Sequence, residues 1–101
     1  LRGDTVLKKY YIDGKVSSIG KEYKYYKSGK WQFFDSKGRL KEECNYERSS
    51  KQGMDTYYNE KGKVIKTEPY LNGYLNGTVT EYNSDGSIKK TTKYLYGKKV
   101  N

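Results

Sequence analysis

The sequence predicts an all-β protein, an elongated antiparallel meander of about four 24-residue β-hairpin repeats in a single-layer sheet. Glycines recur in register with that period, and strand-forming residues (Tyr, Thr, Val, Ile) fall into short runs between them. No window carries the i, i+3, i+4, i+7 apolar pattern of an amphipathic helix. These observations favour a single repeat domain over residues 1–101, with units at approximately 6–29, 30–53, 54–77 and 78–101.

The composition indicates a thin sheet held together by tyrosine more than by aliphatic residues. Leu, Ile, Val and Phe together number 17 of the 101 residues, and 21 basic against 12 acidic residues give a net charge of +9. Such a balance is typical of disordered chains. The 13 tyrosines argue against disorder here, because each aromatic side chain can bury roughly 150–250 Å².

Five columns of residues recur with the 24-residue period and define the units. Glycine supplies the positive φ that hairpin turns and their bulges require. Aromatic and aliphatic residues in the other columns are expected to stack between successive hairpins, which are marginal alone. The columns are Gly14, Gly38, Gly62 and Gly86; Val16, Leu40, Val64 and Ile88; Tyr10, Phe34, Tyr58 and Tyr82; Tyr46, Tyr70 and Tyr94; and Gly29, Gly53 and Gly77.

The third unit shows the expected elements in order. Residues 54–59 are predicted as a strand, residues 60–63 as a tight turn, residues 64–71 as the return strand and residues 72–77 as an outer connection. The same plan at offsets of 24 residues gives about eight strands. Pro69 lies inside the return strand and cannot donate to a ladder, so we expect a bulge or an unpaired group there.

Two places depart from this plan. Glu22 stands in the column of Tyr46, with Tyr23 beside it, which predicts an atypical end unit or a one-residue slip. Ser49 stands where the later units have a glycine. The connection over residues 47–52 is therefore expected to be looser than the others.

Residues 29–43 (GKWQFFDSKGRLKEE) resemble a MORN-repeat variant, the bacterial relative of the membrane occupation and recognition nexus repeat. Residues 57–64 and 81–88 carry the matching parts of the later units, and the resemblance covers about residues 6–101. The later units depart from it at Trp31, where Asp55 and Val79 stand.

This resemblance implies a β-hairpin array used for protein contacts or for scaffolding at a membrane surface. Some bacterial members of the family look like antitoxin components of toxin–antitoxin pairs, and eukaryotic members are attached to lipid kinases. The kinase activity does not transfer, because repeats fill the chain and no glycine-rich loop with a following Lys-Ser/Thr is present.

The residue types that most catalytic and metal sites need are missing. The chain has no His and one cysteine, Cys44, so we predict no enzyme activity, no cofactor and no metal site. Cys44 is expected to be a small, half-buried strand residue. Glu42 and Glu43 are adjacent on a strand and are expected to be solvated on opposite faces. Turn chemistry is expected to explain Asp13, Asp35, Asp55 and Asp85.

Two sets of residues are candidates for partner contact. Trp31, Phe33 and Tyr57 lie outside the recurring aromatic column, and ordinary cross-strand packing is the favoured explanation for them. The alternative is that they are exposed, as aromatic anchors of protein interfaces are. The second set is a line of basic residues one unit apart, Lys15, Arg39 and Lys63.

We therefore expect a non-catalytic protein–protein interaction or scaffold module with an unidentified protein partner. Two alternatives stay open, namely an antitoxin that neutralises a toxin, and electrostatic attachment to an anionic membrane surface. Nucleic acid is disfavoured, because no nucleic-acid module pattern accompanies the interleaved Lys and Tyr of residues 21–27. Homo-oligomers through the open sheet edges are a further alternative.

The compartment is left undecided between cytoplasm and cell envelope, because a lone cysteine does not fix it. The sequence contains no run of about 18 apolar residues, so no transmembrane helix is predicted. The first residue is Leu1, so we expect a fragment or a mature form, with any signal or anchor segment outside this sequence.

Overall fold

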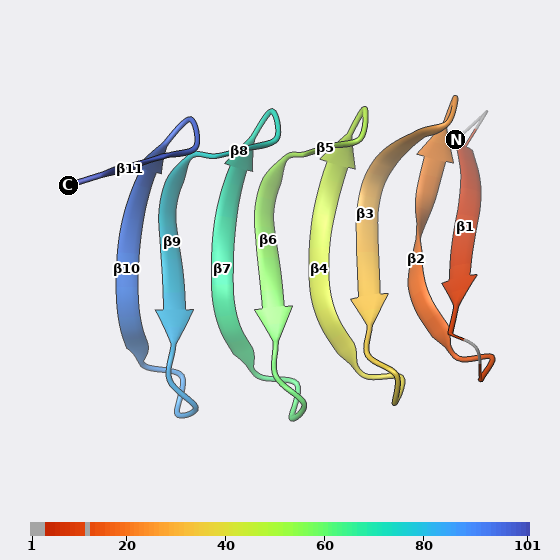
Figure 1. Cartoon of the computed structure of the whole chain (residues 1–101), viewed down its shortest axis with the longest axis horizontal. Coiled ribbons are helices and arrows are strands. Elements are labelled where there is room, and N and C mark those ends of the chain that lie inside the picture. Colours follow the sequence, from red (N-terminus) through yellow and green to blue (C-terminus); the bar gives the residue numbers. More distant parts are fainter. Residues whose placement is uncertain (1–3, 12) are drawn as a thin grey trace.

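The computed structural model describes residues 4–11 and 13–101, whose regular structure is entirely β-strand (Figure 1). Eight strands are long and three are short. They are β1 (Asp4–Tyr10), β2 (Val16–Tyr23), β3 (Tyr26–Phe34), β4 (Leu40–Glu47), β5 (Ser50–Lys51), β6 (Gly53–Tyr58), β7 (Val64–Leu71), β8 (Tyr74–Leu75), β9 (Gly77–Tyr82), β10 (Ile88–Leu95) and β11 (Lys98–Val100).

All strands belong to one open antiparallel sheet in which successive long strands are neighbours. The short strands β5, β8 and β11 turn back onto β4, β7 and β10. The sheet is elongated, with extents of 42 × 30 × 21 Å, and the strand order runs from β1 at one edge to β10 and β11 at the other (Figure 1). The predicted all-β antiparallel meander is confirmed, including eight long strands, whereas the short strands inside the outer connections were not predicted.

The inner turns, around Gly14, Gly38, Gly62 and Gly86, are built alike. Each of these glycines has a φ between 79° and 90°, as hairpin turns require. In each turn a backbone N–H donates to the carbonyl four residues later at 2.7–2.8 Å. Asp13, Asp35 and Asp85 accept backbone N–H groups there, as expected of turn aspartates.

Each hairpin has a register shift beside its inner turn, and none has one at Pro69. In the third hairpin Tyr57 pairs with Lys66 and Tyr58 with Val64, so a bulge lies there. Of the two expectations for Pro69, the bulge does not occur in the β6–β7 ladder, where Pro69 pairs with Met54 without a shift. Pro69 lies where β7 leaves β9 and begins to pair with β8, so the missing N–H falls at a gap in the ladder.

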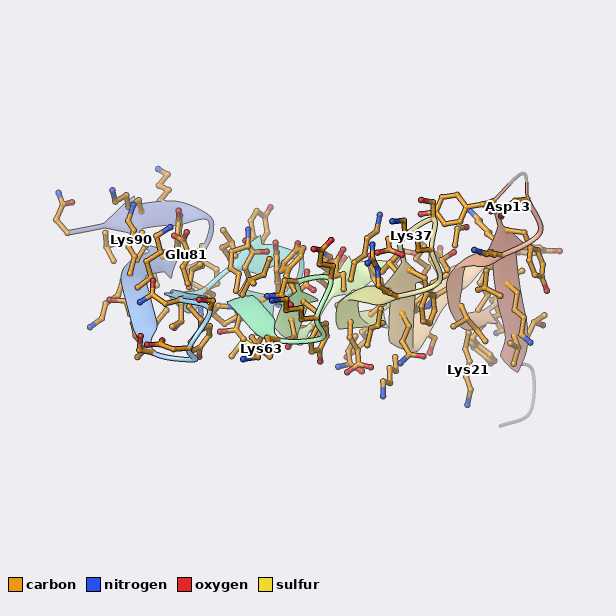
Figure 2. All side chains as sticks on the ribbon, turned by 90° about the horizontal axis from the view of Figure 1, so that it is seen from below. Asp13, Lys21, Lys37, Lys63, Glu81 and Lys90 are labelled. Carbon is orange, nitrogen blue, oxygen red and sulfur yellow. The ribbon has the colours of Figure 1, made fainter. Side chains whose placement is uncertain are left out.

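The strand register divides the side chains between two faces of one layer (Figure 2). One face, named here the Trp31 face, carries a central row of residues, one from each long strand between β2 and β10. The opposite face, the threonine face, carries four threonines in adjacent strands. The central row of the Trp31 face is Gly20, Trp31, Cys44, Asp55, Glu68, Val79 and Thr92, and the threonine row is Thr56, Thr67, Thr80 and Thr91.

Trp31 is the centre of the small core. Its side chain is only 1% exposed, stacks with Phe33 at 6.3 Å between ring centroids and meets Tyr46 edge-on. Its Nε1 donates to the Lys21 carbonyl at 3.0 Å. The ring covers Gly20, where an added Cβ would come within 2.0 Å of it. Trp31 therefore packs against its neighbours, as the favoured prediction of cross-strand packing expects, and the alternative of an exposed Trp31 is wrong.

Replacing Gly20 with Ala is expected to lower the free energy of unfolding by about 2–3 kcal/mol, because the new methyl group must displace the Trp31 ring. Urea unfolding followed by far-ultraviolet circular dichroism measures this loss. Gly20→Ala combined with Trp31→Leu is expected to lose less than the sum of the single changes. Additive losses would contradict the proposed contact.

Candidate functional site

The outer turns lie in a row at one end of the strands, along the top of the sheet in Figure 1. This row, named here the outer-turn ridge, comprises residues 23–26, 47–50, 71–74 and 95–98. In each turn the two central residues have positive φ, between 46° and 86°. Two-residue hairpin turns of this kind match the twist of the flanking strands. The central residues are Lys24 and Tyr25, Arg48 and Ser49, Asn72 and Gly73, and Tyr96 and Gly97.

Hydrogen bonds tie the second, third and fourth outer turns each to the connection before it. Ser49 N–H donates to the Lys27 carbonyl at 3.0 Å, and Gly73 N–H donates to the Lys51 carbonyl at 2.9 Å. Gly97 repeats the bond at 2.7 Å. Side chains add further bonds, such as Gln52 with Asn72. The ridge is therefore a fixed surface rather than a set of independent loops.

These hydrogen bonds between successive outer turns also bear on residues 47–52, which were expected to form a looser connection. Ser49 adopts the left-handed conformation with φ of 66° and makes the same bond as the later glycines. Its hydroxyl in addition accepts the Lys27 N–H at 2.9 Å. The connection is as tight as the others, so the prediction of a looser segment is wrong.

The ridge carries several of the large exposed side chains of the protein. Tyr25 is 96% exposed, and Tyr74 and Tyr96 are more than half exposed. A pocket of about 350 Å³ lies between the first two outer turns, with Lys24 and Arg48 at its lining. The exposed large side chains of the ridge are Tyr23, Tyr25, Tyr26, Leu71, Tyr74, Leu95 and Tyr96.

The predicted aromatic anchors lie elsewhere. Trp31, Phe33 and Tyr57 share the Trp31 face, and the register brings Phe33 and Tyr57 to either side of Glu42. Phe33 and Tyr57 are half-buried, which agrees with the favoured prediction of cross-strand packing rather than with exposure. Sequence reasoning missed the ridge tyrosines, although alignment of Lys24-Tyr25 with Asn72-Gly73 would have shown bulky residues at turn positions that require positive φ.

The predicted basic line lies along the inner turns and is interrupted by acids. Lys15 and Lys63 are exposed, while Arg39 forms ion pairs with Asp35 at 2.8 Å and Glu60 at 3.8 Å. Beside Lys63, a shallow groove of about 720 Å³ runs over the threonine face between the last two inner turns. The structure therefore places these basic residues together with acidic neighbours rather than in a purely positive stripe.

A buried charged cluster lies on the Trp31 face between the second and third units. Asp55 is fully buried in β6, so its assignment as a turn residue was wrong. Lys51 Nζ contacts Asp55 Oδ2 at 2.5 Å and Glu42 Oε2 at 3.1 Å. Cys44 is buried beside them, more deeply than expected. Glu42 is half-buried rather than solvated, and Asp55 Oδ1 has no hydrogen-bond partner.

Burial sets the protonation of this cluster. It raises the pKa of Asp55 from 3.8 to about 7, and the hydrogen bond with Glu42 acts in the same direction, while Lys51 opposes it. Although burial opposes it, hydrogen bonds from Asp55 and Lys51 hold the pKa of Glu42 below its ordinary value. Asp55 is therefore the carboxyl group of the cluster that takes up a proton first as the pH falls, while Glu42 stays ionised beside Lys51.

Glu42, Cys44 and Asp55 place three potential ligand atoms within 4.8 Å of one another. The group does not suit a metal ion, because the Lys51 ammonium already contacts both carboxyl groups. Burial also raises the pKa of the Cys44 thiol to about 11, which keeps it protonated and unreactive at neutral pH. The cluster is best explained as a buried ion-pair network within the sheet.

Within residues 4–11 and 13–101, no helix has the length and apolarity needed to cross a membrane. Comparison of the chain with protein-family models gives no match, and comparisons with curated proteins and with solved structures give none either.

Replacing Asp55 with Val, the residue at the equivalent Val79, tests the cluster. The raised pKa means that folded Asp55 holds its proton more tightly than the unfolded chain, so this stabilisation is present at low pH and is lost as pH rises from about 4 to 7. We expect the fall in unfolding free energy over that window to be smaller in Asp55→Val.

At pH 8 the Asp55→Val protein is expected to be more stable than the wild type by about 1–2 kcal/mol, because Lys51 keeps Glu42 as its partner. Urea unfolding at each pH provides the measurement. Asp55→Asn, which keeps the shape but cannot titrate, should also flatten the profile. An unchanged pH profile in both variants would show that Asp55 has an ordinary pKa.

Proposed function

We propose that the protein is a non-catalytic recognition module and that the outer-turn ridge is the surface that contacts its protein partner. The observation that carries this proposal is backbone strain at the ridge. The six described non-glycine residues with positive φ all lie there. Lys, Tyr, Arg and Ser in that conformation each cost on the order of 1 kcal/mol or more.

Strained residues that persist indicate a use for their side chains. The third unit has Asn72 and Gly73 at these positions, which are the residues that such a turn favours. The first unit has Lys24 and Tyr25 instead, and the Tyr25 side chain extends almost fully into solvent. Stability alone would favour Asn-Gly in every unit, so we infer that the bulky residues serve binding.

The chemistry of the ridge suits a protein partner. Tyr and Arg dominate the residues that contribute most to binding at protein interfaces, and a Tyr side chain loses little conformational entropy when it is fixed. Tyr23, Tyr26 and Arg48 line the 350 Å³ pocket, which is large enough to receive a partner side chain. The hydrogen-bonded ladder holds these anchors in place before binding.

Because some members of the MORN-like family resemble antitoxins, a specific form of this proposal is that the partner is a toxin which the protein neutralises. Attachment to an anionic membrane surface remains the alternative for the basic residues, and it predicts binding that disappears at high salt. Identification of the captured protein separates the first case from a general scaffold. The salt dependence separates both from membrane attachment.

Lys24→Asn combined with Tyr25→Gly gives the first outer turn the residues of the third. We expect the free energy of unfolding to rise by about 1–2 kcal/mol, because the strain is relieved. We also expect capture of the partner from extracts of the native cell, washed at high salt and identified by mass spectrometry, to be lost. A gain in stability together with a loss of binding is the signature of a functional turn.

Lys37→Ala, at an exposed inner-turn position, serves as the matched control and should leave both stability and capture unchanged. The proposal for the ridge is wrong if the stabilised double variant captures the same protein as the wild type. Retention of only the membrane fraction, and only at low salt, would instead support electrostatic attachment.

A further inference from the structure

A basic side chain bridges the second and third inner turns, which lie around Gly38 and Gly62. Arg39 forms ion pairs with Asp35 of its own turn, at 2.8 Å, and with Glu60 of the following turn, at 3.8 Å. This side chain therefore occupies the space between the two turns and has a carboxylate on either side.

The junction of the third and fourth inner turns lacks both of these carboxylates. Lys63 lies one period after Arg39, but Asn59 stands one period after Asp35, and Ser84 one period after Glu60. Lys63 Nζ donates to the Ser84 carbonyl at 3.4 Å. Among the residues that the structure describes, no ion pair involves Lys63. The repeat thus places a cation here and omits the anions that the preceding junction supplies.

A groove of about 720 Å³ opens at this junction on the threonine face, with Lys63 in its lining. Its volume falls within the roughly 300–1,000 Å³ that is usual for small-molecule sites. Four hydroxyl groups also line it, and no side-chain hydrogen bond between described residues uses any of them. They belong to Thr56, Tyr58, Thr67 and Tyr82.

Asp85 gives the groove one negative charge beside the positive charge of Lys63. It accepts the hydroxyl and the backbone N–H of Ser87, at 2.5 and 2.8 Å, and these bonds hold the pKa of Asp85 below its ordinary value. A polyanion would be attracted by Lys63 and repelled by Asp85. The charges therefore favour a ligand with a single carboxylate surrounded by neutral hydrogen-bonding groups.

We propose that this groove binds a saccharide that carries one carboxylate. The carboxylate takes the position against Lys63 that Glu60 takes against Arg39 at the preceding junction. Sugar hydroxyls donate to Asp85 and exchange hydrogen bonds with the threonine and tyrosine hydroxyls. The apolar faces of the sugar rings pack against Tyr58 and Tyr82.

This inference goes beyond the proposed function and does not rest on it. The groove lies at the inner turns, which are at the opposite end of the strands from the outer-turn ridge (Figure 1). It also lies between two units of the array, so it is bounded on both sides by described strands.

Titration of the isotope-labelled full chain with aldotriouronic acid, a glucuronate on two neutral xylose rings, tests the proposal. Its methyl ester is the matched neutral probe. We expect the acid to shift the amide signals of residues 56–67 and 82–86 and to bind about fivefold more tightly than the ester. Lys63→Gln should remove this difference by weakening the acid alone. Lys37→Gln, at an exposed position of the second inner turn, should change neither affinity.

Ser84→Glu provides a second variant that keeps Lys63 in place. It restores at this junction the acidic partner that Glu60 gives to Arg39, so we expect its carboxylate to pair with Lys63. The acid should then bind no more tightly than the ester, while the far-ultraviolet circular dichroism spectrum stays that of the wild type. A peptide, acetyl-Ser-Glu-Ser-amide, distinguishes the class of ligand and should bind at least fivefold more weakly than the acidic saccharide.

Four results would overturn the proposal. The first is an acidic saccharide that shifts no signal in the groove. The second is a preference for the acid over the ester that survives Lys63→Gln. The third is a set of shifts spread over lysines throughout the sheet, which would show charge attraction alone. The fourth is a peptide that binds as tightly as the saccharide, which would assign the groove to an acidic protein segment instead.

Discussion

The one-layer sheet depends on lysine side chains that lie over the aromatic rings of the Trp31 face and shield them from solvent. Lys27 Nζ lies 5.2 Å from the Trp31 ring centroid and 5.1 Å from that of Tyr46, and Lys51 Nζ lies 5.0 Å from that of Tyr70. No second sheet or helix covers this face among the described residues, so the cover must come from the sheet's own connections. A lysine stem buries apolar surface while its ammonium stays wet or meets a ring face. The chain's excess of lysine and tyrosine over leucine follows from this arrangement.

The placement of those lysines depends on the outer turns. Lys27 and Lys51 lie in the segments whose carbonyls receive N–H groups from the following turn. The same bonds that fix the ridge therefore fix the cover of the core. Asp55 is the exception that shows how local this cover is. The third unit has the carboxyl group of Asp55 at the position that Trp31 and Val79 occupy in the second and fourth units. Lys51 forms an ion pair with this carboxyl group.

The period of the sequence predicted the strand order, the inner turns and their glycines, because positive φ and strand alternation are local properties that residue types reveal. Exposure was harder to predict. Alternation assigns Trp31 and Phe33 to one face, but which face is covered depends on where long side chains from the connections lie, and Lys27 gives no such signal in the sequence. Asp55 was misassigned for a similar reason, since its partner Lys51 reaches it from a connection. The ridge was missed because Lys24, Tyr25 and Arg48 are unusual in a left-handed turn, and composition alone describes them as ordinary surface residues.

The bond from each outer turn reaches only the connection before it, 22 residues back in the chain, and it recurs at Ser49, Gly73 and Gly97. Contacts of this nearest-neighbour kind make stability approximately a sum over units. A gene could therefore gain or lose 24 residues by unequal recombination and leave every remaining bond with its partner. A change of one residue would instead move the side chains of a strand to the opposite face. The length of such a protein is free to evolve in whole units, and the number of turns in the outer-turn ridge changes with it.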